Sequence, residues 1–273
     1  MDDPVLKFEN VSLSFEGEPA LQNVSFEVLP GHTRILFGAA GSGKSVLLKL
    51  SIGLLRPDTG EIYLFGQEIS RLKEDDLFEL RSKVGVLFQE GGLFDSFTIE
   101  DNVAYPLLNQ KGSHDGQPDL DRAQQRVREA LRFVELEETL QKFPSELSGG
   151  MRRRAGIARA MVTEPPLMLY DSPTAGLDPI TANTIIALII KARDTKNTTS
   201  MIVTHRYQDG HLLANFRYNP QSGELEAAPR GSGVHENTNY MVFQQGRLVF
   251  EGTQEELEDA TDPYVAKFKA VKT

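Results

Sequence analysis

Gly38-Ala39-Ala40-Gly41-Ser42-Gly43-Lys44-Ser45 is the stretch that decides the fold. It matches the pattern GxxxxGK[ST], whose glycines let backbone N–H groups turn toward a phosphate chain without a Cβ in the way. The short run Thr33–Phe37 before it, which ends in three apolar residues, predicts a strand. The apolar-rich residues after it predict a helix from about Ser45 to Leu55, ended by Arg56-Pro57-Asp58. We therefore expect a phosphate-binding loop, the Walker A loop, between a strand and a helix.

The residue types in this loop match the chemistry of a bound nucleoside triphosphate. The helix that follows adds the positive end of its dipole. Lys44 is expected to bridge the β- and γ-phosphates of ATP, and the Ser45 hydroxyl to ligate Mg²⁺. The predicted ATP-binding residues of the loop are Gly38, Ala39, Ala40, Gly41, Ser42, Gly43, Lys44 and Ser45.

A second motif supplies a metal-binding carboxylate. Leu167–Tyr170 predicts a buried strand, and Asp171 follows it, as in a Walker B motif. Alone, an Asp after an apolar strand is usually a loop residue. Paired with a Walker A loop, Asp171 is expected to hold Mg²⁺ through water, because magnesium keeps much of its hydration shell.

The composition of the chain argues against several kinds of partner and site. The 273 residues contain 29 Lys and Arg against 39 Asp and Glu, which gives a net charge of −10. An acidic surface repels a phosphate backbone, so nucleic-acid binding is not expected. The chain has no cysteine, which excludes disulfides and thiolate metal sites. No run reaches the roughly 18 apolar residues of a membrane span, and the acidic start Met1–Pro4 is unlike a signal peptide.

The remaining pattern predicts both sheet types and a helical middle. A strand–helix–strand alternation around a helix that begins near Pro179 indicates a parallel sheet. In the middle, from about Leu93 to Met161, one helical face is expected to be formed by Ala123, Val127, Ala130, Leu131 and Val134. The predicted strands are Val5–Phe15, Leu21–Leu29, Glu61–Phe65, Val84–Phe88, Leu167–Asp171, Ser200–Thr204, Tyr240–Phe243 and Arg247–Glu251, the first two an antiparallel pair; Phe216–Asn239 predicts a loop or hairpin, and a helix is expected at the C-terminus.

Leu147-Ser148-Gly149-Gly150-Met151 precedes a predicted helix that leads to the Asp171 strand. Ser148 is a good N-cap, and the glycines expose backbone N–H groups at the helix start. An isolated Ser-Gly-Gly of this kind is more often a capped helix without a ligand. Here it resembles the LSGGQ signature of ABC ATPases, with Met151 where Gln is usual.

Further motifs of that family follow in order. Phe15 is similar to the aromatic residue that stacks on adenine, and Gln89 to the Q-loop glutamine that contacts Mg²⁺ and the attacking water. Ala175–Asp178 resembles the D-loop, and Thr204-His205 the switch histidine. The other histidines, His32, His114, His211 and His235, are expected to be surface or loop residues.

The resemblance implies an α/β fold: a P-loop NTPase of the ABC type, with a mixed core sheet, an antiparallel β subdomain and a helical subdomain. It implies a single domain over residues 1–273, with the helical subdomain at about 90–161 and a polar insertion at about 216–239. It also implies two subunits, a homodimer or a pairing with another ABC ATPase. The signature residues Ser148, Gly149 and Gly150 of one subunit then bind the γ-phosphate held by the other, with the D-loop residue Asp178 at the same interface.

One position departs from the family. Glu normally follows the Walker B Asp as the base for the attacking water, and here Ser172 follows Asp171. A serine hydroxyl keeps its proton near neutral pH. Ser172 either positions water in a slow ATPase, with Gln89 and His205 as the other catalytic residues, or marks an ATP-binding switch that does not hydrolyse. General-base catalysis contributes about 10²–10⁴-fold, so we expect reduced but measurable hydrolysis.

Gly85–Ser96 and Glu100–Leu107 resemble the Q-loop region of ATPases that serve MCE-type lipid transporters, the Mla group. This resemblance implies a membrane permease as partner, an MCE lipid-carrying protein beyond it, and a peripheral position at the cytoplasmic face of the inner membrane. Leu93, Phe94 and Phe97 then either contact the permease or belong to the core.

Overall fold

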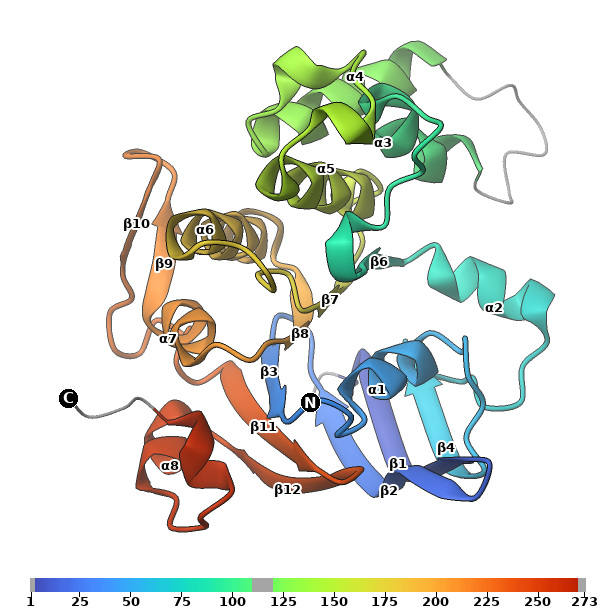
Figure 1. The fold of residues 1–273 in the computed structure, drawn as a ribbon, viewed down its shortest axis with the longest axis vertical. Coiled ribbons are helices and arrows are strands. Elements are labelled where there is room, and N and C mark those ends of the chain that lie inside the picture. The colour runs from blue at the N-terminus through green and yellow to red at the C-terminus, as the bar shows by residue number, and fades with distance from the viewer. Residues whose placement is uncertain (1–2, 110–119, 270–273) are drawn as a thin grey trace.

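The computed structural model describes residues 3–109 and 120–269. At its centre is a six-stranded sheet in the order β12-β11-β3-β8-β7-β6 (Figure 1). All its neighbouring pairs are parallel except β11 and β12, which are antiparallel. Every residue of β3 and β8 is buried, as expected for central strands covered on both faces. The strands are β3 (Thr33–Gly38), β6 (Val84–Leu87), β7 (Leu167–Asp171), β8 (Thr199–Val203), β11 (Thr238–Gln244) and β12 (Arg247–Gly252).

A four-stranded antiparallel sheet, β2-β1-β4-β5, lies beside α1. Its strands are β1 (Leu6–Phe15), β2 (Glu18–Val28), β4 (Thr59–Leu64) and β5 (Gln67–Glu68), and the predicted β1–β2 pair is confirmed. The helix α1 (Lys44–Ser51) ends four residues earlier than expected. The chain turns at Gly53, whose φ of 64° lies in the left-handed region. A further helix, α2 (Glu74–Arg81), was not predicted.

The middle of the chain forms helices that lie apart from α1 in Figure 1. They are α3 (Ile99–Leu108), α4 (Leu120–Phe133) and α5 (Gly149–Met161), with 3₁₀ turns η1 (Gln89–Gly91), η2 (Glu137–Thr139) and η3 (Pro144–Glu146). Of the predicted apolar face, Val127, Leu131 and Val134 are buried in the main core, while Ala123 and Ala130 are half-buried.

The last third of the chain supplies β8, β11 and β12 of the six-stranded sheet and the helices beside them. The long helix α6 (Pro179–Lys196) is capped by Asp178 and lies against β9 (Phe216–Asn219). β9 pairs with β10 (Glu224–Ala227), so the predicted hairpin in Phe216–Asn239 is confirmed. The helix α7 (Tyr207–Asn215) was not predicted; α8 (Gln254–Asp259) and the 3₁₀ turn η4 (Val265–Phe268) follow β12. Among the described residues, no helix has both the length and the apolar character needed to cross a membrane.

Candidate nucleotide site

The Walker A loop connects β3 to α1 and wraps around Lys44. Lys44 is only 5% exposed, and its Nζ donates to the carbonyls of Gly38 (2.9 Å) and Ala39 (2.8 Å) and to Ser42 Oγ (3.1 Å). Gly43 must be glycine, because its φ is 102° and a Cβ would lie 2.6 Å from the Ala20 carbonyl. The loop therefore holds a cation at the start of a helix, where the helix dipole also favours an anion.

Asp171 and His205 face the same loop from β7 and from the end of β8. Burial lowers the pKa of Lys44, and the nearby charge of Asp171 opposes that shift. Partial burial lowers the pKa of His205, and the Lys44 charge lowers it further, whereas a hydrogen bond to the Gly38 backbone and the Asp171 charge raise it. Three of the predicted site residues, Lys44, Asp171 and His205, thus converge.

Ser172 directly follows Asp171, and both its backbone and its side chain are held by hydrogen bonds. It is buried, its φ is 52°, and its Oγ donates to Asp171 Oδ1 at 3.3 Å. Its N–H donates to the Val203 carbonyl at 3.0 Å. Arg153 of α5 reaches the same turn, donating to the carbonyls of Ser172 (3.2 Å) and Ala175 (3.0 Å). The side chain after the Walker B Asp is therefore held toward that carboxylate.

A buried carboxylate that the motifs did not indicate ties the two loops together. Asp209 of α7 is fully buried, and its Oδ2 accepts from the hydroxyls of Thr174 (2.5 Å) and Thr204 (2.6 Å). Thr174 follows Ser172 by two residues, and Thr204 directly precedes His205. Burial raises the pKa of Asp209, opposed by the two hydroxyls and by Arg206, whose Nη1 lies 3.5 Å from Oδ1. A lone Asp in an unpredicted helix offers no sequence pattern by which to find it.

Gln89 belongs to a different part of the surface. With Gly149 of the signature and Gly176 of the D-loop, it lines a cavity of about 550 Å³, whose lining does not include Lys44 or Asp171. Helix α5 packs tightly against this Q-loop segment, since a Cβ on Gly156 would lie 2.7 Å from the Gly91 carbonyl. The structure thus groups Gln89 with the signature rather than with the Walker A loop.

The signature forms the exposed start of α5. Ser148 is the N-cap, and its Oγ accepts from Met151 N at 3.3 Å. Asp178 caps α6 in the same way, accepting from the N–H groups of Ile180 and Thr181, and its hydrogen bonds to Thr181 lower its pKa. Because α5 and α1 lie apart in Figure 1, the signature of this chain does not approach its own Walker A loop.

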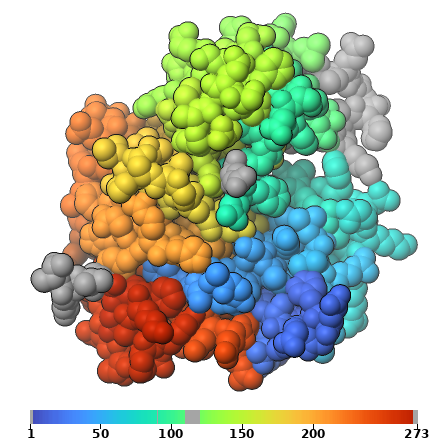
Figure 2. All heavy atoms as spheres, in the orientation of Figure 1, coloured from blue at the N-terminus to red at the C-terminus, as the bar shows by residue number. Residues whose placement is uncertain are grey.

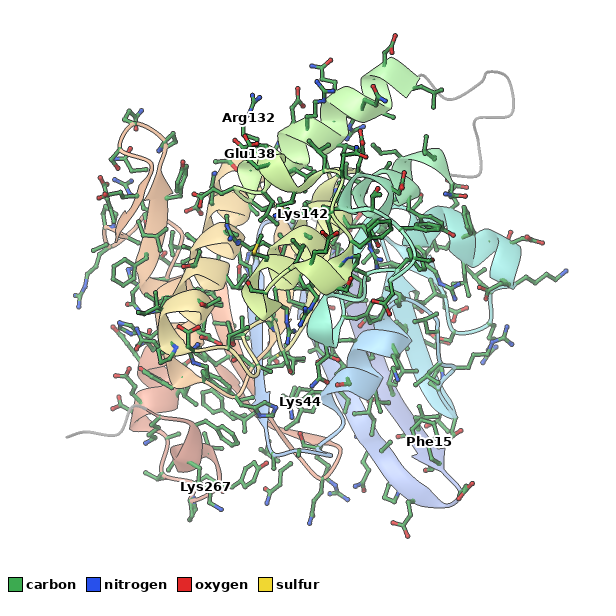
Figure 3. All side chains as sticks on the ribbon, turned by 45° about the horizontal axis from the view of Figure 1, so that its top comes forward. Phe15, Lys44, Arg132, Glu138, Lys142 and Lys267 are labelled. Atoms are coloured by element: carbon green, nitrogen blue, oxygen red, sulfur yellow. The ribbon has the colours of Figure 1, made fainter. Side chains whose placement is uncertain are left out.

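The remaining predicted contact, Phe15, ends β1. Its side chain is 46% exposed, and Figure 3 shows it near the end of the β1–β2 hairpin, on the same side of the molecule as Lys44. An exposed ring at this position is available to stack on a planar ligand.

An exposed aromatic cluster lies beyond Gln89. The rings of Phe94, Phe97 and Tyr105 contact one another, with centroids 4.9–6.2 Å apart, and are 41%, 36% and 40% exposed. The Arg159 guanidinium lies 5.3 Å from the centre of the Phe94 ring. Phe94 and Phe97 are therefore not core residues, whereas Leu93 is half-buried against the core. The cluster is of the kind that marks a protein contact.

The prediction for the other histidines is wrong for one of them. His211 is half-buried in α7, with its Nδ1 3.2 Å from Asn215 Nδ2 and from Gln254 Nε2. His32 and His235 lie in loops or turns and are half-buried, and His114 lies outside the described residues.

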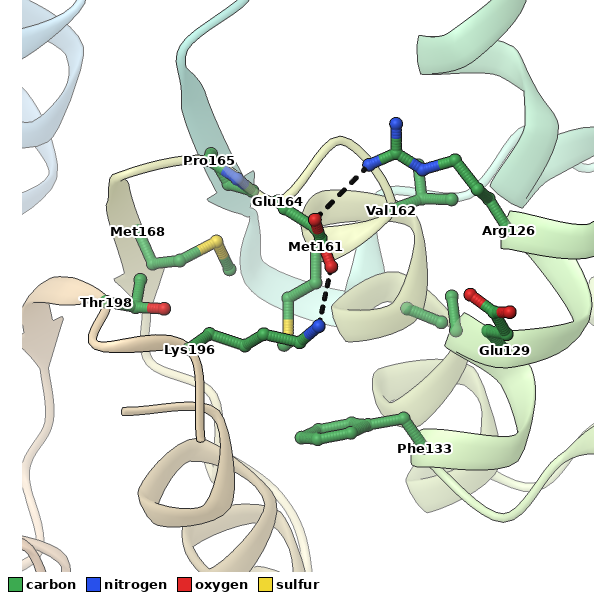
Figure 4. A pocket seen from close by; sticks show the side chains of 12 residues that line it. Arg126, Glu129, Phe133, Met161, Val162, Glu164, Pro165, Met168, Lys196 and Thr198 are labelled. Carbon is green, nitrogen blue, oxygen red and sulfur yellow. Dashed lines mark hydrogen bonds and ion pairs between the residues drawn. The ribbon is translucent and has the colours of Figure 1, made fainter. Parts of the chain in front are cut away.

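A small cavity of about 90 Å³ lies between α4 and the segment that joins α5 to β7, and its lining includes Phe133, Met161 and Met168 (Figure 4). At its rim, Glu164 pairs with Lys196 (2.5 Å) and Arg126 (3.8 Å). None of the predicted site residues lines it, so it is separate from the nucleotide site.

Comparisons with known proteins identify the family of the chain. Residues 21–175 match the family described as "ABC transporter". The chain is 32% identical over 268 residues to "Intermembrane phospholipid transport system ATP-binding protein MlaF" of Haemophilus influenzae, covering 98% of this chain and 91% of that protein. It is 38% identical over 200 residues to "Probable ribonucleotide transport ATP-binding protein mkl" of Mycobacterium leprae, covering 73% of this chain but only 56% of that protein. The solved dimeric ATP-binding cassette MJ0796, bound to ADP and Pi, matches with a TM-score of 0.73 and 28% identity, over 91% of this chain and 98% of that one.

Proposed function

Because this chain belongs to the ABC transporter family, we propose that it is the ATP-binding and ATP-hydrolysing subunit of an ABC transporter complex. The observation that carries the proposal is the convergence of Lys44, Asp171 and His205 at one loop. A cation, a carboxylate that can hold Mg²⁺ and a histidine at the start of a helix are groups that can stabilise a transferring phosphoryl group.

In this proposal each residue of the loop has a part. Lys44 exchanges its carbonyl partners for the β- and γ-phosphates. The backbone of the Walker A loop surrounds the phosphates of ATP, and Phe15 stacks on the adenine base. His205, beside Lys44 at Gly38, contacts the γ-phosphate. Hydroxyl and carboxylate oxygens are the ligands that Mg²⁺ prefers, so Ser45 and Asp171 fit that ion. When bound there, Mg²⁺ would neutralise part of the charge on the phosphates.

We further propose that two chains complete each site, either as a homodimer or with another ABC ATPase. The separation of α5 from α1 supports this, since the start of α5, with Ser148 and Gly149 exposed, would need a phosphate held by another chain. Asp178 lies beside them at the same face. The dimeric state of the similar cassette MJ0796 gives further support.

The transporter that fits best is one for phospholipids of the Mla/MCE type. The similarity to MlaF extends along nearly all of both chains, whereas that to the ribonucleotide transport protein covers little more than half of the relative. The cluster of Phe94, Phe97 and Tyr105 is then the surface for a membrane permease, with an MCE protein beyond it. The subunit works at the cytoplasmic face of the inner membrane and binds no nucleic acid.

A second candidate is an ATP-binding switch that does not hydrolyse, favoured by Ser172 in place of the usual Glu. One experiment separates the candidates: ATP binding, dimer formation and phosphate release are measured with and without the copurified permease. Lys44→Ala is expected to weaken ATP binding about 10- to 100-fold, because it removes charge-assisted hydrogen bonds, while Lys49→Ala on the exposed face of α1 is not. ATP-dependent dimers without phosphate release select the switch, and equal binding by Lys44→Ala overturns both.

A further inference from the structure

The C-terminal segment, residues 262–268, contacts the Walker A loop through the Tyr264 hydroxyl. Tyr264 Oη accepts a hydrogen bond from the Ala39 N–H at 3.0 Å and donates one to the Phe243 carbonyl of β11, also at 3.0 Å. Tyr264 and Ala39 are 225 residues apart in sequence. The hydroxyl therefore connects the first turn of the loop to the strand beside β3.

Tyr264 is itself held in place. Asp262 Oδ1 accepts from the N–H groups of Tyr264 (2.8 Å) and Val265 (2.9 Å), which fixes the backbone of this turn. The ring packs edge-on against Phe268, and Phe268 stacks on Phe37 of β3 with centroids 5.7 Å apart. In the space-filling view the C-terminal segment, in red, lies against the blue region of the Walker A loop (Figure 2). The segment is packed, so its hydroxyl has one defined position.

The other end of the loop is fixed from the same direction. The Gly246 N–H, in the turn between β11 and β12, donates to the Ser42 carbonyl at 3.2 Å. At the start of the loop, a Cβ on Gly38 would lie 2.5 Å from the same Phe243 carbonyl that Tyr264 binds. The C-terminal part of the chain thus supports the loop from outside, at Ala39 and at Ser42.

We propose that Tyr264 is a positioning residue for nucleotide binding. Its hydroxyl holds Ala39, whose own carbonyl, with that of Gly38, accepts from Lys44 Nζ. Fixing this backbone before the ligand arrives removes part of the ordering cost of binding, so the loop binds triphosphate more tightly. The proposal rests on the proposed function of this loop as the ATP site, and it makes ATP affinity depend on the C-terminal segment.

The test compares wild type with Tyr264→Phe, which keeps the ring and removes only the hydroxyl. Tyr207→Phe is the matched control: its hydroxyl also joins the C-terminal part of the chain, donating to Glu258 of α8 at 2.5 Å, and is not bonded to the Walker A loop. We expect Tyr264→Phe to raise the Kd and the KM for ATP about 3- to 10-fold, the effect of one neutral hydrogen bond. The kcat should stay unchanged, and Tyr207→Phe should match wild type in ATP affinity.

Hydrogen exchange of the Ala39 amide in the nucleotide-free protein gives a readout that does not depend on ATP. It should be faster in Tyr264→Phe and unchanged in Tyr207→Phe. Unchanged affinity in Tyr264→Phe overturns the proposal, and so does an equal loss of affinity in both variants, because that would reflect loosening of the C-terminal segment in general. If wild type takes up no ATP, the proposed function fails, whereas the exchange rates still decide whether Tyr264 positions the loop.

Discussion

Arg153 Nη1, on the helix that begins with the signature, donates to the main-chain carbonyl of Ser172 at 3.2 Å. Its Nη2 donates to the Ala175 carbonyl at the start of the D-loop. One buried guanidinium therefore connects the helix expected to meet a partner's phosphate with the turn that follows Asp171. We therefore expect a movement of α5 to shift the turn that carries Ser172.

The first prediction concerns this contact. Arg153→Lys keeps the charge but loses the planar pair of donors, so one carbonyl is left without a partner. We expect phosphate release to fall about tenfold, because hydrogen bonds from charged groups contribute about 1.5–3 kcal/mol each, with little change in Kd for ATP. Arg154→Lys is the matched control, since Arg154 donates to the Val134 and Glu135 carbonyls, away from the D-loop. Equal losses in both variants would show a general destabilisation of α5.

The second prediction concerns the missing base. Ser172→Glu places a carboxylate where the family carries one, and phosphate release should rise about 10²-fold or more if the missing base limits the reaction. Serine already adopts the left-handed φ of 52° at this position, so the conformational cost of that φ changes little with the substitution. Ser172→Gln has the same shape without a base and should show no rise. The measurement is steady-state phosphate release with the permease present. If Ser172→Glu gives no increase, the missing base does not limit hydrolysis.

How much of this site the sequence predicted depends on how local each feature is. The Walker A loop and the Asp171 strand follow from short runs of glycine and apolar residues, and the structure has both the strand and the helix around the loop. The early end of α1 was missed because apolar residues continue past Gly53, whose left-handed φ is not visible in the pattern.

The supporting residues were missed for a different reason. The hydrogen-bond partners of Arg153, Asp209 and Tyr264 lie in other loops, up to 225 residues away in sequence. A charged or aromatic residue without a periodic or motif context predicts no particular contact. Such residues are found only when the fold brings the loops together.

The third prediction is a pH dependence from Asp209. Burial raises the folded-state pKa of this carboxyl above its ordinary value of 3.8, so the folded protein binds its proton more tightly than the unfolded chain. The contribution of Asp209 to stability is therefore full below about pH 3.8 and is lost as pH rises through the folded-state pKa.

Asp209→Asn removes that titration and keeps an oxygen acceptor for the hydroxyls of Thr174 and Thr204. Urea unfolding of both proteins from pH 4 to pH 8 should show wild type losing stability relative to the variant as pH rises, by at most about 1.4 kcal/mol per pH unit. The difference should then level off above the folded-state pKa. If the wild type instead becomes more stable relative to Asp209→Asn as pH rises, the hydroxyls and Arg206 lower the pKa of Asp209 by more than burial raises it.

The fourth prediction concerns the tight packing of α5 on the Q-loop. In Gly156→Ala the new Cβ would meet the Gly91 carbonyl at 2.7 Å, Leu87 Cδ1 at 2.8 Å and Gly91 Cα at 3.0 Å, and two of these atoms are backbone that cannot rotate away. Overpacking of this kind costs about 1–3 kcal/mol, against a helix-propensity gain of about 1 kcal/mol. We expect lower stability in urea and a displaced Gln89, seen as faster hydrogen exchange in η1. Gly149→Ala in the same helix meets only Leu177 at 3.7 Å and should not lower stability. If Gly156→Ala instead stabilises the protein, α5 and η1 separate easily, and the Q-loop is not held by this helix.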